Sequence, residues 1–160
     1  MLLEYKRGVN LFDAPNIAEY LFIGRGAELL EMQKIRKVRV LGGMGGIGKT
    51  QLSIAYVKRH ADTYSSVFWL NATSEVALKS SFRSVARRIS GLDTVDLLED
   101  DQVGTRVSNW FCELNNSCWL LIYDTYDDPD EYDITKYYPQ VMHGSIIVTT
   151  RVPARLMLEN

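Results

Sequence analysis

The chain of 160 residues has the length of one domain and is large enough to bury one core. Its composition, 46% hydrophobic and 24% charged, is that of a soluble globular protein and argues against disorder. A formal charge of -2 gives no indication of a nucleic-acid or membrane surface. The two cysteines lack metal-ligand spacing, and the chain shows neither a signal-peptide pattern nor a long apolar run. We therefore expect a cytoplasmic protein that binds neither nucleic acid nor membrane.

Helical and strand patterns alternate along the chain. Residues 1–21 are expected to form an irregular lead-in, and residues 22–160 a single domain. Apolar residues at helical spacing predict a first helix over 27–36. Short β-branched or apolar runs predict strands over 38–41, 67–70, 118–123 and 146–149. This alternation predicts the α/β class, with a mainly parallel sheet that is flanked by helices.

Three further helices are predicted between these strands. One opens directly from a glycine-rich loop at Lys49, and the next has Ser74 as its cap and Glu75 in its first turn. The apolar face of that helix is expected to comprise Val76, Leu78, Phe82, Val85 and Ile89. The last helix is expected to bury Val103, Val107, Trp110, Phe111 and Leu114.

The loop "GMGGIGKT" at residues 43–50 matches the phosphate-binding pattern G-x-x-x-x-G-K-[ST], and it lies between a predicted strand and a predicted helix. Bare glycine backbone lets successive N–H groups point at an anion, and the helix N-terminus adds partial positive charge. Lys49 is predicted to reach the β- and γ-phosphates, and the Thr50 hydroxyl to hold magnesium. The predicted nucleotide contacts are Gly43, Gly45, Gly46, Ile47, Gly48, Lys49, Thr50 and Gln51. A glycine turn without a ligand is the alternative.

Magnesium in such a site also needs a carboxylate at the end of a neighbouring strand. The run "LLIYD" supplies it at Asp124. The acidic residues that follow are interpreted mainly as a solvated loop, because their spacing does not fit a calcium-binding loop. They are Asp127, Asp128, Asp130 and Glu131.

Five stretches, "FIGR", "GGMGGIGKTQL", "VFWLNA", "LLIYDTYDD" and "GSIIVTTR", occur in that order between residues 22 and 151. This arrangement resembles the NB-ARC/NACHT-type ATPases of the STAND class, most closely the fungal NOD-like receptors. The resemblance implies a three-layer P-loop NTPase that binds ATP or ADP with Mg²⁺. It also implies that Ile23, Gly24 and Arg25 line the adenine side, that Asp124 is the Walker B aspartate, and that Arg151 senses the γ-phosphate. No Asn-Lys-x-Asp stretch for reading guanine is present.

Two departures from the family pattern matter. Many relatives carry an acid or asparagine directly after the Walker B aspartate, whereas this chain has Thr125, which predicts slow hydrolysis at most. The family's fifth strand, helical and winged-helix subdomains and repeats are also missing, so the 38–41 strand should lie at a sheet edge that allows self-association. We expect either an excised nucleotide-binding domain or a natural short form.

The function expected from this resemblance is an ADP/ATP switch in an NLR-like receptor of innate immunity or programmed cell death. Nucleotide exchange would control oligomerisation. One alternative is a small-molecule kinase, whose basic lid would be Arg83, Arg87 and Arg88. Another is an interaction module that has lost its ligand. His143 is assigned no role.

Overall fold

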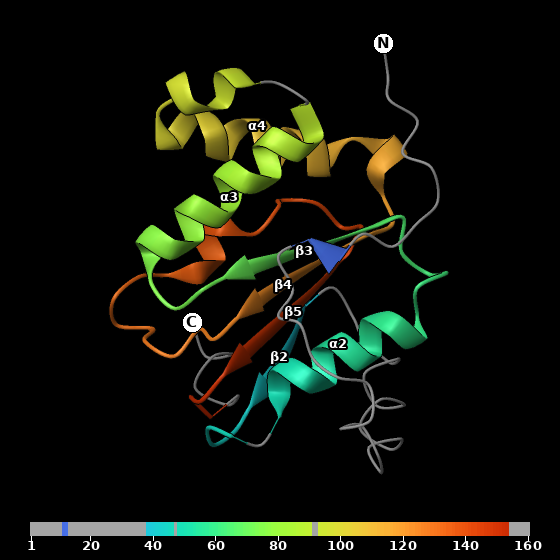
Figure 1. The fold of residues 1–160 in the computed structure, drawn as a ribbon, viewed down its shortest axis with the longest axis vertical. Helices are drawn as coiled ribbons and strands as arrows, with labels where there is room; N and C mark the ends of the chain where they lie inside the picture. Colours follow the sequence, from blue (N-terminus) through green and yellow to red (C-terminus); the bar gives the residue numbers. More distant parts are fainter. Residues whose placement is uncertain (1–10, 13–37, 47, 91–92, 154–160) are drawn as a thin grey trace.

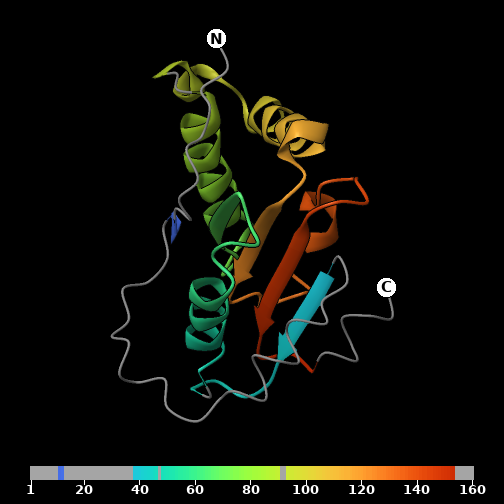
Figure 2. The ribbon, with the colours of Figure 1, turned by 90° about the vertical axis from the view of Figure 1, so that its right-hand side faces the viewer.

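The computed structural model describes residues 11–12, 38–46, 48–90 and 93–153. Its sheet has the strand order β1-β3-β4-β5-β2, and every strand pair is parallel. The strands are β1 (Leu11–Phe12), β2 (Val38–Gly42), β3 (Ser66–Asn71), β4 (Trp119–Asp124) and β5 (Ser145–Thr150). Within the described residues β2 lies at one edge of the sheet beside β5, as Figure 2 shows. The predicted α/β class is therefore confirmed.

The helices are α2 (Lys49–Arg59), α3 (Glu75–Ser90) and α4 (Asp100–Cys112), with short 3-10 turns η2 (Asp93–Leu97), η3 (Leu114–Asn116) and η4 (Ile134–Tyr137). Helix α2 lies on one side of the strands, and α3 and α4 lie on the other (Figure 1). The Ser74 hydroxyl accepts a hydrogen bond from Ala77 N–H at 3.2 Å, which is the predicted cap. The helix predicted over 27–36 falls outside the described residues.

The central strand β4 explains why helices cover both faces. Side chains alternate along a strand, and five of its six residues are buried. Leu120 and Ile122 pack into the cluster that contains α2, whereas Leu121 and Tyr123 pack into the cluster that contains α3 and α4. The continuous apolar run thus fits a parallel sheet that is buried on both faces.

Three details differ from the sequence predictions. Val76 is 78% exposed, because about 100° per residue places it roughly 200° around the helix from Leu78. Leu114 is 84% exposed, because α4 ends at Cys112 and the chain turns before it can join the apolar face. Strand β1, in which Leu11 and Phe12 pair with β3, is too short to leave a periodic pattern in the lead-in.

None of the helices within the described residues is both long enough and apolar enough to span a bilayer.

Tyr123 predicts a loss of stability at alkaline pH. Its side chain is fully buried, and its hydroxyl donates to the carbonyl of Tyr137 at 2.7 Å. Burial raises its pKa well above 10.0, so the folded chain keeps a proton that the unfolded chain releases. The protonated Tyr123 hydroxyl therefore makes its full contribution to the free energy of unfolding below pH 10.0, the pKa of an unperturbed tyrosine. This contribution is lost as the pH rises towards the folded pKa, and the free energy of unfolding then falls by about 1.4 kcal/mol per pH unit. The free energy of unfolding, measured with urea between about pH 9 and pH 11, should fall less steeply with pH for Tyr123→Phe than for the unmodified protein. Parallel curves for the two proteins would contradict this.

Candidate nucleotide-binding site

The glycine loop leaves β2 at Gly42 and enters α2 at Lys49. Gly46 has φ 81° and Gly48 has φ 79°, which is the left-handed region that favours glycine. The N–H of Gly43 donates to the carbonyl of Thr150 at 3.2 Å, so the start of the loop is tied to β5. Because no side chain caps α2 at Gly48, the N-terminus of this helix presents backbone N–H groups to the loop.

The side chain of Lys49 extends back across the glycine loop that precedes it. Its Nζ donates to the carbonyl oxygens of Gly43 at 2.6 Å and Met44 at 2.8 Å. These acceptors show that the ammonium group reaches oxygen atoms on the far side of the loop. An ammonium group held in this way is suited to phosphate oxygens, which carry more negative charge than carbonyls.

The carboxylate of Asp124 stands at the end of β4 and meets the first turn of α2. Thr50 Oγ1 donates to Asp124 Oδ1 at 2.9 Å. Two further donors were not predicted from the sequence: Thr149 Oγ1 donates to Oδ1 at 2.5 Å, and Trp69 Nε1 donates to Oδ2 at 3.3 Å. The signal that could have found them is the two-residue alternation of strands, which places Trp69, Asp124 and Thr149 on the sheet face that α2 covers.

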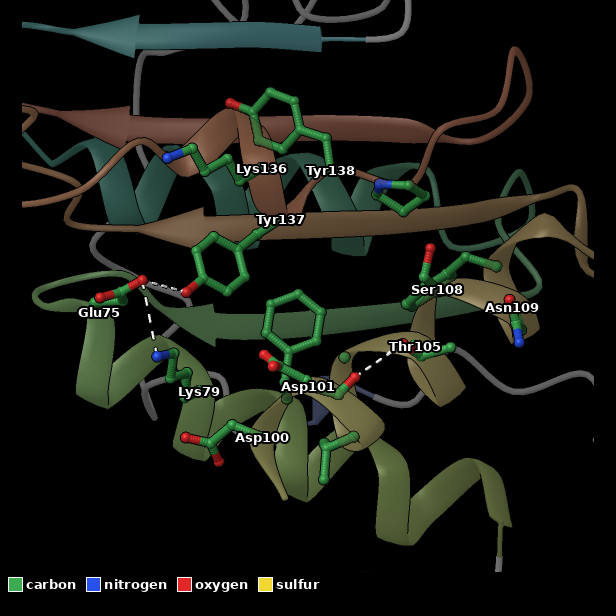
Figure 3. A pocket seen from close by; sticks show the side chains of 15 residues that line it. Glu75, Lys79, Asp100, Asp101, Thr105, Ser108, Asn109, Lys136, Tyr137 and Tyr138 are labelled. Carbon is green, nitrogen blue, oxygen red and sulfur yellow. Dashed lines mark hydrogen bonds and ion pairs between the residues drawn. The ribbon is translucent and has the colours of Figure 1, made fainter. Parts of the chain in front are cut away.

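A cavity of about 400 Å³ opens beside the loop and is called the nucleotide cavity below. It is lined by Gly45, Gly46, Gly48, Lys49, Thr50, Gln51, Thr125, Asp127, Thr149, Thr150 and Arg151. A larger cavity of about 600 Å³ lies between α3, α4 and η4, and contains none of the loop residues (Figure 3). The smaller cavity is therefore the candidate site because of the residues that line it, and not because of its volume.

Arg151 is at the rim of the nucleotide cavity, where it pairs with Asp127. Both its backbone N–H, at 2.6 Å, and its Nε donate to the Asp127 carboxylate. Its side chain is 64% exposed, whereas that of Asp127 is only 19% exposed. Asp127 is therefore an exception within the acidic segment interpreted mainly as a solvated loop, because its carboxylate is largely covered and accepts hydrogen bonds from Arg151.

Four predicted site residues cannot be placed in the structure, and His143, to which the sequence assigns no role, lies elsewhere in it. Ile23, Gly24, Arg25 and Ile47 lie outside the described residues. His143 contacts the carbonyl of Phe111 through Nε2 at 2.9 Å, away from the nucleotide cavity.

Two of the three arginines considered as a kinase lid, Arg83 and Arg87, face acidic partners. Arg83 pairs with Asp100 at 2.7 Å and also donates to the carbonyl of Val95. Arg87 pairs with Asp96. These contacts hold the helix face against η2 and the start of α4, which differs from the mobile basic lid that the kinase alternative requires.

The donor set fits magnesium, which prefers oxygen ligands and is usually bound through one or two carboxylates together with phosphates and water. The Thr50 hydroxyl gives its hydrogen to Asp124, which leaves its lone pairs for a cation. Magnesium bound there would neutralise phosphate charge. Asp124 and Thr50 are the side chains that would hold it.

The sequence model of the NB-ARC domain family matches residues 25–154, which is most of the chain. The chain belongs to the NB-ARC family. It is therefore a nucleotide-binding P-loop NTPase domain, and NB-ARC domains in general bind ATP or ADP with Mg²⁺. No curated protein matches the chain.

A comparison with solved structures supports the fold of this NB-ARC domain. The crystal structure of Cdc6p from Pyrobaculum aerophilum is similar, with a TM-score of 0.57 and 15% sequence identity. The match covers 91% of this chain and 42% of that chain. At this identity the likeness concerns the fold alone.

Proposed function

We propose that this NB-ARC domain is the adenine-nucleotide switch of an NLR-like receptor that acts in innate immunity or programmed cell death. In this proposal ADP accompanies the resting state, and exchange for ATP favours an oligomer. The observation that carries the proposal is the joint placement of Lys49, Thr50 and the Asp124 carboxylate at the glycine loop. The proposed partners are the C-terminal subdomains and repeats of a full receptor in the cytoplasm, and further copies of the chain.

Each residue of the site has a proposed role. Lys49 would exchange the carbonyls of Gly43 and Met44 for β- and γ-phosphate oxygens, since the ammonium group already reaches across the loop. The loop N–H groups would bind the remaining phosphate oxygens. Ile23, Gly24 and Arg25 are proposed to line the adenine ring, as the family resemblance implies.

Arg151 is proposed to distinguish ATP from ADP. Its exposed guanidinium borders the nucleotide cavity, and its Cδ lies 3.3 Å from the position of a Cβ added to Gly45. A γ-phosphate would compete with Asp127 for this guanidinium, because carboxylate and phosphate oxygens both accept charge-assisted hydrogen bonds from arginine. ATP would then loosen the contact between β5 and the segment that follows β4.

Slow hydrolysis is proposed because the position beside Asp124 lacks a base. Thr125 occupies it, with φ 65°, and its N–H donates to Thr149 Oγ1 at 2.8 Å. Asp127, the next carboxylate in the nucleotide cavity, is engaged by Arg151. A hydroxyl does not act as a carboxylate base at neutral pH.

Thr125→Asp should raise ATP turnover by roughly 100-fold, because it adds a carboxylate that can accept a proton from water. Thr125→Asn is the matched control, since asparagine and aspartate both tolerate the left-handed backbone that this position adopts. Phosphate release under single-turnover conditions measures the effect. Equal turnover in the two variants would show that the missing carboxylate does not limit hydrolysis.

The switch itself is tested by identifying the nucleotide that the protein carries through purification and by titrating the emptied protein with ADP, ATP and GTP in a calorimeter. We expect bound ADP, and affinity for both adenine nucleotides above that for GTP. Size-exclusion chromatography then compares the ADP and ATP forms. Absence of binding by any adenine nucleotide would overturn the proposal. If the ADP and ATP forms bind nucleotide but elute at the same volume, the proposed control of oligomerisation would be overturned and only nucleotide binding would remain.

A further inference from the structure

The Asp124 carboxylate is held from three sides by donors on separate elements. Thr50 on α2 and Thr149 on β5 both donate to Oδ1, at 2.9 Å and 2.5 Å. Trp69 on β3 donates to Oδ2 at 3.3 Å. Strand β4 lies between β3 and β5, so each neighbouring strand contributes one donor. Both carboxylate oxygens are thereby fixed in direction.

The parallel register brings these side chains together. Trp69 pairs with Ile122, two residues before Asp124, and Ile122 also pairs with Ile147, two residues before Thr149. Because side chains two apart share a sheet face, all of them project towards α2. Diagonal neighbours on one face are within reach of a long aromatic side chain.

The two strand donors have defined hydrogen-bond directions. Trp69 is only 4% exposed, and its indole N–H can only donate. Thr149 is 2% exposed, and its hydroxyl accepts from the N–H of Thr125 at 2.8 Å. A backbone N–H cannot accept, so the single hydrogen of the Thr149 hydroxyl is directed to Asp124. These contacts restrict rotation of the carboxylate.

We propose that Trp69 and Thr149 are positioning residues that set the Mg²⁺ affinity of this domain by orienting Asp124. The inference rests on the proposed binding of a magnesium nucleotide. Neither side chain need touch the cation, because partners that orient a metal-binding carboxylate change metal affinity through it. A carboxylate that is already oriented loses less rotational freedom when it binds a cation.

Trp69→Phe tests the indole contact, because it keeps an aromatic ring in the core and removes the N–H donor together with part of the ring volume, a loss of volume that a Trp→Phe control elsewhere in the core shares. The readout is the ratio of ADP affinity in Mg²⁺ to ADP affinity in EDTA. We expect this ratio to fall by roughly tenfold or more, with the affinity in EDTA unchanged. In the unmodified protein the indole N–H resonance of residue 69 should shift when Mg²⁺ is added to the ADP complex.

Trp119→Phe is the matched control on the adjacent strand. Its indole N–H donates to the carbonyl of Phe111 at 3.0 Å, away from Asp124, so the same chemical change should leave the magnesium ratio intact. At the other donor, Thr149→Val removes the hydroxyl at nearly constant shape and should lower the ratio. Thr149→Ser keeps the hydroxyl and should restore it.

The outcomes separate this inference from the proposed function. An unchanged magnesium ratio in both Trp69→Phe and Thr149→Val would overturn the inference alone. An equal fall in Trp69→Phe and Trp119→Phe would also overturn it, because it would indicate a general effect on the sheet. Failure of the unmodified protein to bind ADP in either Mg²⁺ or EDTA would overturn the proposed function, and the inference with it.

Discussion

Lys49→Ala should weaken binding of both ADP and ATP by at least about 100-fold. The ammonium group is the cation that reaches across the loop, where it now contacts the carbonyls of Gly43 and Met44. Hydrogen bonds to charged groups contribute about 1.5–3 kcal/mol each, and two such bonds to phosphate account for a loss of this size. Isothermal titration calorimetry measures the affinity directly.

Lys79→Ala is the control for the loss of a positive charge. Lys79 lies on α3, 37% exposed and 3.9 Å from Glu75, and it lines the larger cavity instead of the nucleotide cavity. Its removal should leave nucleotide affinity unchanged. A thermal shift gives a second readout, since nucleotide at about 100 times its dissociation constant adds roughly 2.7 kcal/mol to stability. Retention of that shift by Lys49→Ala would contradict the assigned role of the lysine.

Gly144→Ala should destabilise the domain by about 3–5 kcal/mol, a large part of the stability of a typical domain. Gly144 has φ +75°, and a Cβ there would lie 2.2 Å from Trp119 Cε2. That ring is fully buried, donates to the Phe111 carbonyl and contacts the Phe111 ring at a centroid distance of 5.0 Å. Because the indole is held on these sides, it cannot move away from the added methyl group. Urea unfolding measures the change.

Gly104→Ala makes the same substitution with the opposite expected sign. Gly104 lies inside α4, and an added Cβ would meet no atom within 4 Å. Alanine is favoured over glycine within a helix by about 0.5–1 kcal/mol, so this variant should be slightly more stable. Destabilisation of both variants to a similar extent would show that contact with Trp119 is not the cause at Gly144.

The sequence was informative where the determinants of structure are local. The glycine loop, its following helix and the apolar run that ends at Asp124 are each set by neighbouring residues. The parallel arrangement also followed from the alternation of strands with helices.

The register between strands that are distant in the chain cannot be predicted from local sequence in the same way. The roles of Trp69 and Thr149 depend on which residues of β3 and β5 lie beside Asp124, and the role of Asp127 depends on a partner 24 positions away. Val76 shows a different failure. The sequence pattern predicts this valine on the apolar face of α3, whereas its angular position on the helix places it in solvent.

The last two residues of β5 and Arg151, which follows them, contact three different parts of the molecule. Thr149 donates to Asp124, the carbonyl of Thr150 receives the N–H of Gly43, and Arg151 pairs with Asp127. A shift of this strand by a fraction of an ångström would alter all three contacts together. The end of β5 therefore links the Asp124 carboxylate, the start of the glycine loop and Asp127, so a displacement at any one of them would be felt at the other two.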